Sequence, residues 1–457
     1  MSDRTRADAV YGALLTRQGE QWVQPRVERT RRVLDLLDDP QRTYRVVHVT
    51  GTNGKTSTSR IIESIVRAHG LRTGLFTSPH LERFTERIMI DGEPIDDGLI
   101  ADAWDEIAPI VDLVDAELAA TGDAALTFFE LLTVLAFVAF ADAPVDVAVV
   151  EVGMGGTWDS TNTADGDVAV IAPIDLDHAD KLGSTIAEIA TVKAGIIKDG
   201  AAVVAAEQDA DALTVLQDAA AARDATLAVE GSAFGLTDQR LAVGGQQLSV
   251  RGLAATYDDL YLPLYGAHQG HNAALAIAAV ESLIGAGAQA IAPDVLTEGL
   301  AQVTSPGRLQ LIGVAPTVLV DSAHNPHGAR ALVSALSDSF DFDEWGIVFG
   351  AFADKDTAGI IAALAGVATH VFVTAPDSGR AADPDALADL VEAAGVPVTV
   401  HRDLADAAEA AREWAGAAER RAVVIAGSVV LAGEALRLAA EEDWSQRGDG
   451  DDDGRHA

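Results

Sequence analysis

The feature that most constrains this chain is a glycine-containing loop between a predicted strand and a predicted helix. The residues YRVVHVT at 44–50 form the apolar, β-branched run that is typical of a buried strand. GTNGKTS follows at 51–57, and a helical pattern continues from Gly54 to His69. Glycines let backbone N–H groups approach phosphate oxygens, and a helix N-terminus adds partial positive charge. The order of strand, glycine loop and helix therefore predicts a phosphate-binding loop.

This loop departs from the usual phosphate-loop pattern at one position. The pattern G-x-x-x-x-G-K-[ST] has its first glycine where this chain has Val49. Lys55 is placed to neutralise the β- and γ-phosphates, and the Thr56 hydroxyl is placed to face Mg²⁺ or phosphate. An ordinary glycine turn between a strand and a helix is the alternative. We predict ATP contacts from the whole loop, which consists of Gly51, Thr52, Asn53, Gly54, Lys55, Thr56 and Ser57.

Runs rich in Val and Ile alternate with helical patterns along the chain. This alternation predicts α/β units around a mostly parallel sheet. The section 234–264 differs, because alternating residues flank a Gly-Gly pair that favours a small β-hairpin. Strands and helices alternate again after TSPGR at 304–308, where Pro and Gly indicate a domain boundary. We expect a larger domain at 1–303, a smaller α/β domain at 304–440 and a disordered acidic tail at 441–457.

Composition limits the partners of the chain. Seventy acidic residues against 32 basic ones give a net charge of −38, which repels nucleic acid and acidic membranes. The absence of cysteine excludes disulfides and thiolate metal sites. The longest apolar stretch, 131–141, is far shorter than the roughly 18 to 20 residues that span a bilayer, and the N-terminus does not resemble a signal peptide. We expect a cytoplasmic monomer that acts on small molecules and binds neither nucleic acid nor membranes.

Three short segments supply ligands of the kind that nucleotide-bound Mg²⁺ takes. Ser78 follows one predicted strand, and Glu151 lies at the carboxyl end of another, where α/β sheets place their ligands. Asp177 and His178 follow a third strand. Each residue taken alone has a structural or loop role as its alternative. Their combination with the glycine loop favours a metal–nucleotide site.

A series of motifs resembles the folate branch of the Mur ligase family, the folylpolyglutamate and dihydrofolate synthases. The resemblance covers residues from about 10 to 440, and its loop GTNGKTS, without the first glycine, is shared by all Mur ligases. SPHLERFTERI and DSAHNP are specific to the folate branch. The resemblance implies a P-loop Mur-ligase-type ATPase domain followed by a Rossmann-like glutamate-ligase domain. Its motifs are GTNGKTS, TSPHLERFTERI, TFFE, EVGMGGTWDSTN, DLDHAD, KAGIIK, GHNAALA, PGRLQ, DSAHNPHG and ADKD.

The resemblance implies an ATP-dependent amide ligase. In that reaction a carboxylate attacks the γ-phosphate to give an acyl phosphate and ADP, and the amine of L-glutamate then attacks the acyl carbon. Dihydropteroate or a reduced folate supplies the carboxylate, and a bifunctional enzyme that uses both is our leading hypothesis. The nearest alternative is an enzyme with only one of the two activities. A P-loop ATPase switch and a peptidoglycan Mur ligase are further alternatives, which the absence of N-K-x-D and the presence of SPHLERF disfavour.

The same resemblance assigns roles to individual residues. It implies Mg²⁺ bound with ATP, held by Ser78, Glu151 and His178, and it allows a monovalent cation. Lys193 matches the lysine that the family carbamylates, with a helix-surface lysine as the alternative. Nucleotide contacts are implied for Asn272, Arg308 and Asp321. The catalytic residues that we infer are Lys55, Lys193 and His324.

The pterin-bearing substrate is expected near TFFE and GMGG. Phe128 and Phe129 would stack on its flat ring, and the alternative for both is the core of a helix. Many family members have R-[LF]-D where this chain has Thr157-Trp158-Asp159, so a cation is absent and Trp158 offers stacking instead. QPRVER at 24–29 replaces D-[LM]-G-L-E-R and lacks the acidic contact. The predicted contacts are Thr127, Phe128, Phe129, Glu130, Gly153, Gly155, Gly156 and Trp158.

Overall fold

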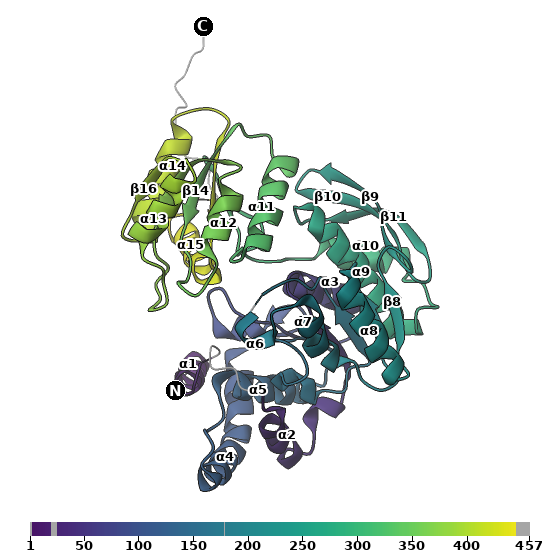
Figure 1. Ribbon diagram of the computed structural model, residues 1–457. Coiled ribbons are helices and arrows are strands. Elements are labelled where there is room, and N and C mark those ends of the chain that lie inside the picture. The colour runs from purple at the N-terminus through teal and green to yellow at the C-terminus, as the bar shows by residue number, and fades with distance from the viewer. Residues whose placement is uncertain (1, 20–24, 178, 445–457) are drawn as a thin grey trace. The chain divides into compact units, whose positions relative to one another are not determined.

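The computed structural model describes residues 2–19, 25–177 and 179–444. The chain divides into two compact units (Figure 1). The N-terminal unit consists of Met1–Pro263 and His268–Thr304, and the C-terminal unit consists of Leu264–Ala267 and Ser305–Ala457. A short segment from the middle of the chain, Leu264–Ala267, thus belongs to the C-terminal unit. In the described part of the chain, no helix has the length and apolar character needed to cross a membrane.

The N-terminal unit is built on a large sheet that is mostly parallel, as predicted. Within the described residues its strand order is β4-β3-β2-β5-β1-β6-β7-β8. At one edge, β3 pairs antiparallel with β2, and β4 pairs antiparallel with β3. The central strands are Val-rich and buried apart from Arg45 at the start of β1, which is typical of a parallel sheet covered on both faces. The strands are β1 (Arg45–Thr50), β2 (Thr73–Phe76), β3 (Ile88–Ile90), β4 (Glu93–Pro94), β5 (Val147–Glu151), β6 (Val168–Ile171), β7 (Ala202–Ala205) and β8 (Thr226–Val229).

Helices pack on this sheet through faces that their sequences make apolar. The longest apolar stretch of the chain lies in α5 (Phe128–Asp142), which is buried nearly all round and joins a core cluster with α1, α2, α4 and β2. A second cluster involves β6, β7, α7 and α8. The other helices of this unit are α1 (Asp3–Leu15), α2 (Val27–Leu36), α3 (Lys55–Ala68), α4 (Asp97–Thr121), α6 (Ala179–Leu182), α7 (Ile186–Lys193), α8 (Ala210–Ala222), α9 (Ala267–Gly285) and α10 (Pro293–Ala301).

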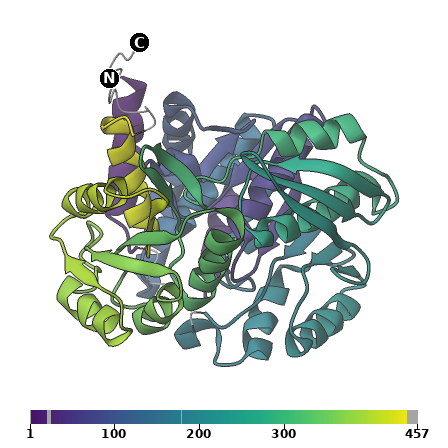
Figure 2. The ribbon, with the colours of Figure 1, turned by 90° about the horizontal axis from the view of Figure 1, so that it is seen from above.

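The section with the Gly-Gly signal forms a separate antiparallel sheet. Its strands are β9 (Gly235–Ala242), β10 (Gly245–Arg251) and β11 (Thr256–Leu262), which form a layer of their own in the N-terminal unit (Figure 2). Val243 and Gly244 connect β9 to β10, and Gly244 has a φ of 78° that favours glycine. The predicted hairpin is confirmed.

The C-terminal unit is a second α/β sheet covered by helices. In the described residues its order is β12-β13-β17-β14-β15-β16, and β12 is antiparallel to the others. The strands are β12 (Gln310–Val314), β13 (Thr317–Val320), β14 (Glu344–Phe349), β15 (Ala368–Val373), β16 (Val398–Val400) and β17 (Arg421–Ala426). The helices are α11 (Pro326–Ser339), α12 (Thr357–Leu364), α13 (Pro384–Ala393), α14 (Leu404–Gly416) and α15 (Val429–Glu441).

The packed chain extends beyond Glu441, where a disordered tail was predicted to begin. Trp444 is 3% exposed, and the Arg412 guanidinium lies 4.4 Å from its ring centroid. The Trp444 carbonyl also accepts a hydrogen bond of 3.2 Å from the Val314 backbone N–H. An aromatic ring buried on a cation and tied to β12 anchors the segment, so the prediction was wrong for 441–444. The rest of the predicted tail, 445–457, lies outside the described residues.

Candidate active site

The glycine loop lies where β1 ends and α3 begins. Gly51 has a φ of 153° and Gly54 a φ of 82°, a backbone region that residues with a side chain rarely adopt. A Cβ atom on Gly54 would lie 2.7 Å from Asn272 Oδ1, and one on Gly51 would lie 2.7 Å from the Ala172 Cβ. The backbone turn therefore needs glycine at both positions. It places the loop at the N-terminus of α3, whose first N–H groups form an anion-binding site.

Lys55 folds back over the loop. Its Nζ donates to the Gly51 and Thr52 carbonyls, at 3.2 Å each. The Thr52 hydroxyl donates to the Asp175 carbonyl and accepts from the Asp175 backbone N–H, both at 3.0 Å. The loop is thus tied to the segment that follows β6, at the carboxyl edge of the sheet where α/β proteins bind ligands.

A buried carboxylate faces the first turn of α3. Glu151 ends β5, is 1% exposed, and lies level with Val49 in the register of β1 and β5. The Thr56 hydroxyl lies 2.9 Å and 3.0 Å from its two carboxylate oxygens, and the Ser78 backbone N–H lies 3.4 Å from Oε2. The structure therefore brings the Thr56 hydroxyl and the Ser78 backbone N–H to the Glu151 carboxylate.

These donors suit Mg²⁺. A carboxylate and a hydroxyl are hard oxygen ligands, and Mg²⁺ is usually held by one or two carboxylates together with water and phosphate oxygens. The predicted ligand His178 lies outside the described residues. Among the described residues no cluster of three or more His, Cys, Asp or Glu side chains that could hold a metal ion is present. Glu151 and Thr56 are the side chains that would hold the ion.

Lys193 is buried against the same loop. It ends α7, is 3% exposed, and its Nζ donates to the Gly51 carbonyl at 2.6 Å. Burial, together with the charge on Lys55, lowers the pKa of Lys193 to about 7 against the opposing effect of Asp177 and Asp159. The alternative of a helix-surface lysine is therefore wrong. Burial of the amine thus favours its neutral form more than exposure to water would.

Asn272 lies behind the loop on α9. It is 5% exposed, and its Nδ2 donates to Gln269 Oε1 at 3.0 Å. Gln269 in turn lies 3.4 Å from the Ser57 hydroxyl, so the two amides connect α9 to the start of α3. Sequence analysis did not identify Gln269, although its position one helical turn before Asn272 placed it on the same face.

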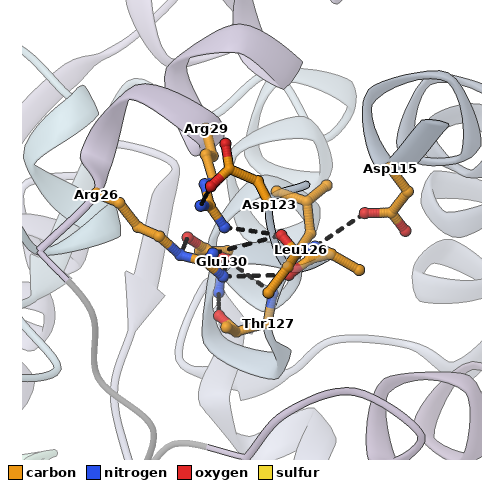
Figure 3. A network of polar contacts seen from close by, with 9 residues as sticks. Arg26, Arg29, Asp115, Asp123, Leu126, Thr127 and Glu130 are labelled. Atoms are coloured by element: carbon orange, nitrogen blue, oxygen red, sulfur yellow. Dashed lines mark hydrogen bonds and ion pairs between the residues drawn. The ribbon is translucent and has the colours of Figure 1, made fainter. Parts of the chain in front are cut away.

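The structure accounts for three of the four TFFE residues by packing and capping. Thr127 and Glu130 form a capping box at the start of α5, and Glu130 also pairs with Arg26 (Figure 3). Phe128 is 5% exposed within the core cluster, so the alternative prediction of a helix-core residue is the one that holds for it. Phe129 is half-buried, and its ring tip lies 2.5 Å from where a Cβ on Gly153 would be. Phe129 is thus the TFFE side chain that contacts the GMGG loop.

The GMGG loop is held by a carboxylate that sequence analysis did not select. Asp159 is 4% exposed, and it accepts hydrogen bonds from the Met154 N–H at 2.9 Å and from the Thr161 hydroxyl at 2.6 Å. Trp158 is half-buried, with its ring 3.1 Å from the Cβ position of Gly155, so it packs on the loop itself. A Cβ on Gly156 would lie 2.7 Å from the Val192 carbonyl and 2.8 Å from that of Lys193. The loop therefore runs from Phe129 to the helix end that carries Lys193.

Three predicted residues lie in the C-terminal unit. The Asp321 carboxylate, just after β13, accepts from the Leu309 N–H at 2.9 Å and from the Ala323 N–H at 2.8 Å. Burial raises the pKa of Asp321, and the charge of Arg308 opposes that rise. His324 Nδ1 lies 2.9 Å from the Ser322 carbonyl, so that nitrogen carries the proton. Arg308, Asp321 and His324 thus belong to one turn region of this unit, and the other predicted residues that the structure describes belong to the N-terminal unit.

The N-terminal unit has the site of a P-loop nucleotide-binding protein. Its glycine loop, two lysines and buried carboxylate lie at the carboxyl edge of a parallel sheet, and a second α/β unit follows. The chain matches the Mur ligase middle domain over residues 49–280 and the Mur ligase glutamate ligase domain over residues 307–429. It therefore belongs to the Mur ligase family, whose members are ATP-dependent ligases.

Known proteins resemble the chain over nearly its whole length. A Mycobacterium tuberculosis dihydrofolate synthase/folylpolyglutamate synthase is 46% identical over 439 residues, which cover 91% of this chain and 90% of that protein. The structure of M. tuberculosis folylpolyglutamate synthase complexed with ADP has a TM-score of 0.91 at 44% identity, covering 96% and 99% of the two chains. Escherichia coli FolC in complex with DHPP and ADP has a TM-score of 0.82 at 29% identity, covering 95% and 98%. The resemblance to the folate branch is confirmed.

Proposed function

We propose that the protein joins L-glutamate to dihydropteroate and to reduced folates at the expense of ATP. The observation that carries this proposal is the convergence of Lys55, Glu151 with Thr56, and Lys193 on one glycine loop. Phosphoryl transfer depends on positioning and charge neutralisation, which such a site supplies. The relatives named for both activities, and the related structures that hold ADP or DHPP, support the choice of substrates. We also propose that the protein is a cytoplasmic monomer.

The residues divide the reaction into two steps. The start of α3 and Lys55 hold the phosphates of ATP, with Gly51, Thr52, Asn53, Gly54, Thr56 and Ser57 forming the rest of the cradle. Mg²⁺, held by Glu151 and Thr56, with Ser78 beside them, supplies positive charge when bound. The substrate carboxylate oxygen attacks the γ-phosphorus and ADP leaves. The α-amine of glutamate then attacks the acyl carbon, an amide bond forms, and phosphate and a proton are released.

We assign the remaining predicted residues to supporting roles in this reaction. Asn272, Arg308 and Asp321 contact the nucleotide, and Arg is suited to phosphate because its planar group donates two parallel hydrogen bonds. His324 takes part in catalysis from the C-terminal unit, with its Nδ1 proton held by the Ser322 carbonyl. Phe129, Gly153, Gly155, Gly156 and Trp158 line the place of the pterin ring. Of the proposed pterin contacts, Phe129 and Trp158 are the aromatic side chains that remain half-exposed beside the GMGG loop.

We further propose that Lys193 is carbamylated and that a monovalent cation assists binding. The neutral amine attacks the carbon of CO₂, a carbamate forms and one proton is released, which converts a neutral buried amine into an anion suited to a metal. Protein equilibrated with ¹³C-bicarbonate should give a carbamate resonance that Lys193→Met removes. Lys198→Met is the matched control, because Lys198 is a second partly buried lysine whose pKa burial lowers. A resonance that survives in Lys193→Met contradicts the assignment, and turnover in potassium, sodium and lithium salts tests the cation.

The proposed function is tested by ATP-dependent incorporation of labelled L-glutamate. Dihydropteroate and tetrahydrofolate are offered separately, and incorporation into both is expected. Incorporation into one acceptor alone identifies an enzyme with a single activity. No incorporation into either refutes the proposal. ATP hydrolysis that needs neither acceptor nor glutamate would indicate an ATPase switch, and turnover of a peptidoglycan precursor would indicate the other branch of the family.

A further inference from the structure

Two arginines of the α2 region bind the segment that connects α4 to α5 (Figure 3). Arg26 pairs with Glu130 through two contacts, Nε to Oε1 at 3.0 Å and Nη2 to Oε2 at 3.1 Å. The same guanidinium donates to the Ala125 carbonyl at 3.1 Å. The two side chains are 10% and 7% exposed, so this ion pair is largely removed from water. Removal of one partner from such a pair is costly because the other charge stays buried.

The ion pair fixes the first turn of α5. Glu130 Oε2 also accepts from the Thr127 N–H at 2.7 Å, and the Glu130 N–H lies 3.3 Å from the Thr127 hydroxyl. A single carboxylate therefore holds both Arg26 and the helix cap, so the direction in which α5 starts depends on the arginine.

Phe129 lies within that first turn and reaches toward the site. Its ring contacts Gly153 closely and lies 5.8 Å from the ring of Phe76, measured between centroids. Gly153 is two residues beyond Glu151, which faces the glycine loop. Arg26 and Glu130 thus hold the helical turn that carries Phe129, and Phe129 contacts the loop that follows the strand end with the buried carboxylate.

We propose that Arg26 and Glu130 are positioning residues that fix Phe129 as a stacking platform for the pterin ring of the acceptor. This inference rests on the proposed function. A half-buried phenyl ring held on one side by Gly153 offers its exposed part to a flat aromatic ligand. Arg26 occupies the place of the glycine in D-[LM]-G-L-E-R, so the ion pair is a feature of this chain that the family motif does not contain.

Arg29 provides a matched control. It lies one turn after Arg26, carries the same charge and binds the same connecting segment, where it donates to the Ala124 carbonyl at 2.7 Å. Its ion pair is with Asp123 at 2.9 Å, whereas that of Arg26 is with Glu130. Loss of Arg29 should therefore loosen the segment without releasing the cap of α5.

The experiment compares Michaelis constants in the full chain. Arg26→Met should raise the KM for dihydropteroate about tenfold and leave the KM for ATP unchanged, because the platform binds only the acceptor. Arg26→Lys should recover part of the loss, since an ammonium still pairs with Glu130. Arg29→Met should change neither KM by more than about twofold. Circular dichroism confirms that each variant is folded.

The possible results separate the positioning role from a structural one. An unchanged KM for dihydropteroate in Arg26→Met, an equal rise in Arg29→Met, or an equal rise in the KM for ATP would overturn the inference. If Arg26→Met does not fold, Arg26→Met/Glu130→Met leaves no unpaired buried charge and is expected to show the same rise in KM. Wild-type protein that ligates glutamate to neither acceptor would overturn the proposed function and this inference together. Wild-type turnover with an unaffected Arg26 variant overturns this inference alone.

Discussion

His48 makes the stability of the N-terminal unit depend on pH in a direction that the structure fixes. It lies in the middle of β1, is 0% exposed, and its Nε2 lies 2.9 Å from the Thr161 hydroxyl. Because that hydroxyl donates to Asp159, His48 Nε2 carries the proton and donates to Thr161. Its Nδ1 has no hydrogen-bond partner among the described residues. A second proton on this ring would therefore have no acceptor.

The size of the effect follows from the pKa. Burial, helped by the charge of Lys198, lowers the pKa of His48 from 6.5 to about 3 in the folded protein. The unfolded chain takes up a proton near pH 6.5 and the folded chain does not, so the stabilising contribution is complete above that pH and is lost as the pH falls. A pH of about 5 lies roughly 1.5 units below the ordinary pKa of histidine. Each pH unit below that pKa costs about 1.4 kcal/mol, so His48 should lower the free energy of unfolding by about 2 kcal/mol at pH 5 relative to pH 7.5.

Urea unfolding of the wild type and of His48→Gln at about pH 7.5 and pH 5 measures this contribution. The stability difference between the two proteins should shrink by about 2 kcal/mol at the lower pH, since Gln does not titrate. His80, whose pKa is also lowered to about 3, affects both proteins equally and cancels.

His271→Gln is a control of opposite sign. The hydrogen bond that His271 donates to the Glu230 carboxylate raises the pKa of His271, so its contribution is complete below the ordinary pKa and is lost as the pH rises. The cost of His271→Gln should therefore be larger at about pH 5 than at pH 7.5. A difference between wild type and His48→Gln that stays constant across this range would refute the reasoning.

Two further predictions concern the loop and the carboxylate. Gly54→Ala adds a Cβ at positive φ and 2.7 Å from Asn272 Oδ1, so it should lower stability by about 1 to 2 kcal/mol and also raise the KM for ATP. Gly70 is the control, because it has a similar φ of 77° but open space around the added Cβ. Gly70→Ala should therefore lower stability and leave the KM for ATP unchanged. If the KM for ATP were the same in both variants, the proposed clash with Asn272 would be contradicted. Glu151→Gln keeps an acceptor for the Thr56 hydroxyl but removes the charge, so the Mg²⁺ concentration for half-maximal turnover should rise about 10- to 100-fold. An unchanged Mg²⁺ titration would exclude Glu151 as a ligand.

Local sequence was sufficient to predict the strand and the helix on either side of the glycine loop. The Val-rich run before Gly51 is β1, and the helix predicted from Gly54 to His69 is α3 at Lys55–Ala68. These predictions succeed because strand propensity, glycine conformation and helix start are all encoded within a few adjacent residues.

Long-range contacts could not be predicted in this way. Lys193 bonds a carbonyl 142 positions earlier in the chain, and Arg26 pairs with a carboxylate 104 positions later. Both contacts depend on how helices pack on the sheet, which no local pattern encodes. The burial of Phe128 against the partial exposure of Phe129 depends in the same way on the rotation of α5. The packing of Trp444 was missed because a charged tail surrounds this single aromatic residue in the sequence.

The hydrogen bonds of the glycine loop have a consequence for how tightly a nucleotide can be held. Lys55 already donates to two loop carbonyls, and the Thr56 hydroxyl already donates to Glu151. Arrival of Mg²⁺ and ATP is therefore an exchange of partners, in which each new bond is formed as an existing one is given up. The measured affinity for nucleotide therefore reflects the difference in free energy between the free loop and the nucleotide-bound loop, both of which have their hydrogen bonds formed. A variant that weakens the resting bonds would bind nucleotide more tightly and release ADP more slowly.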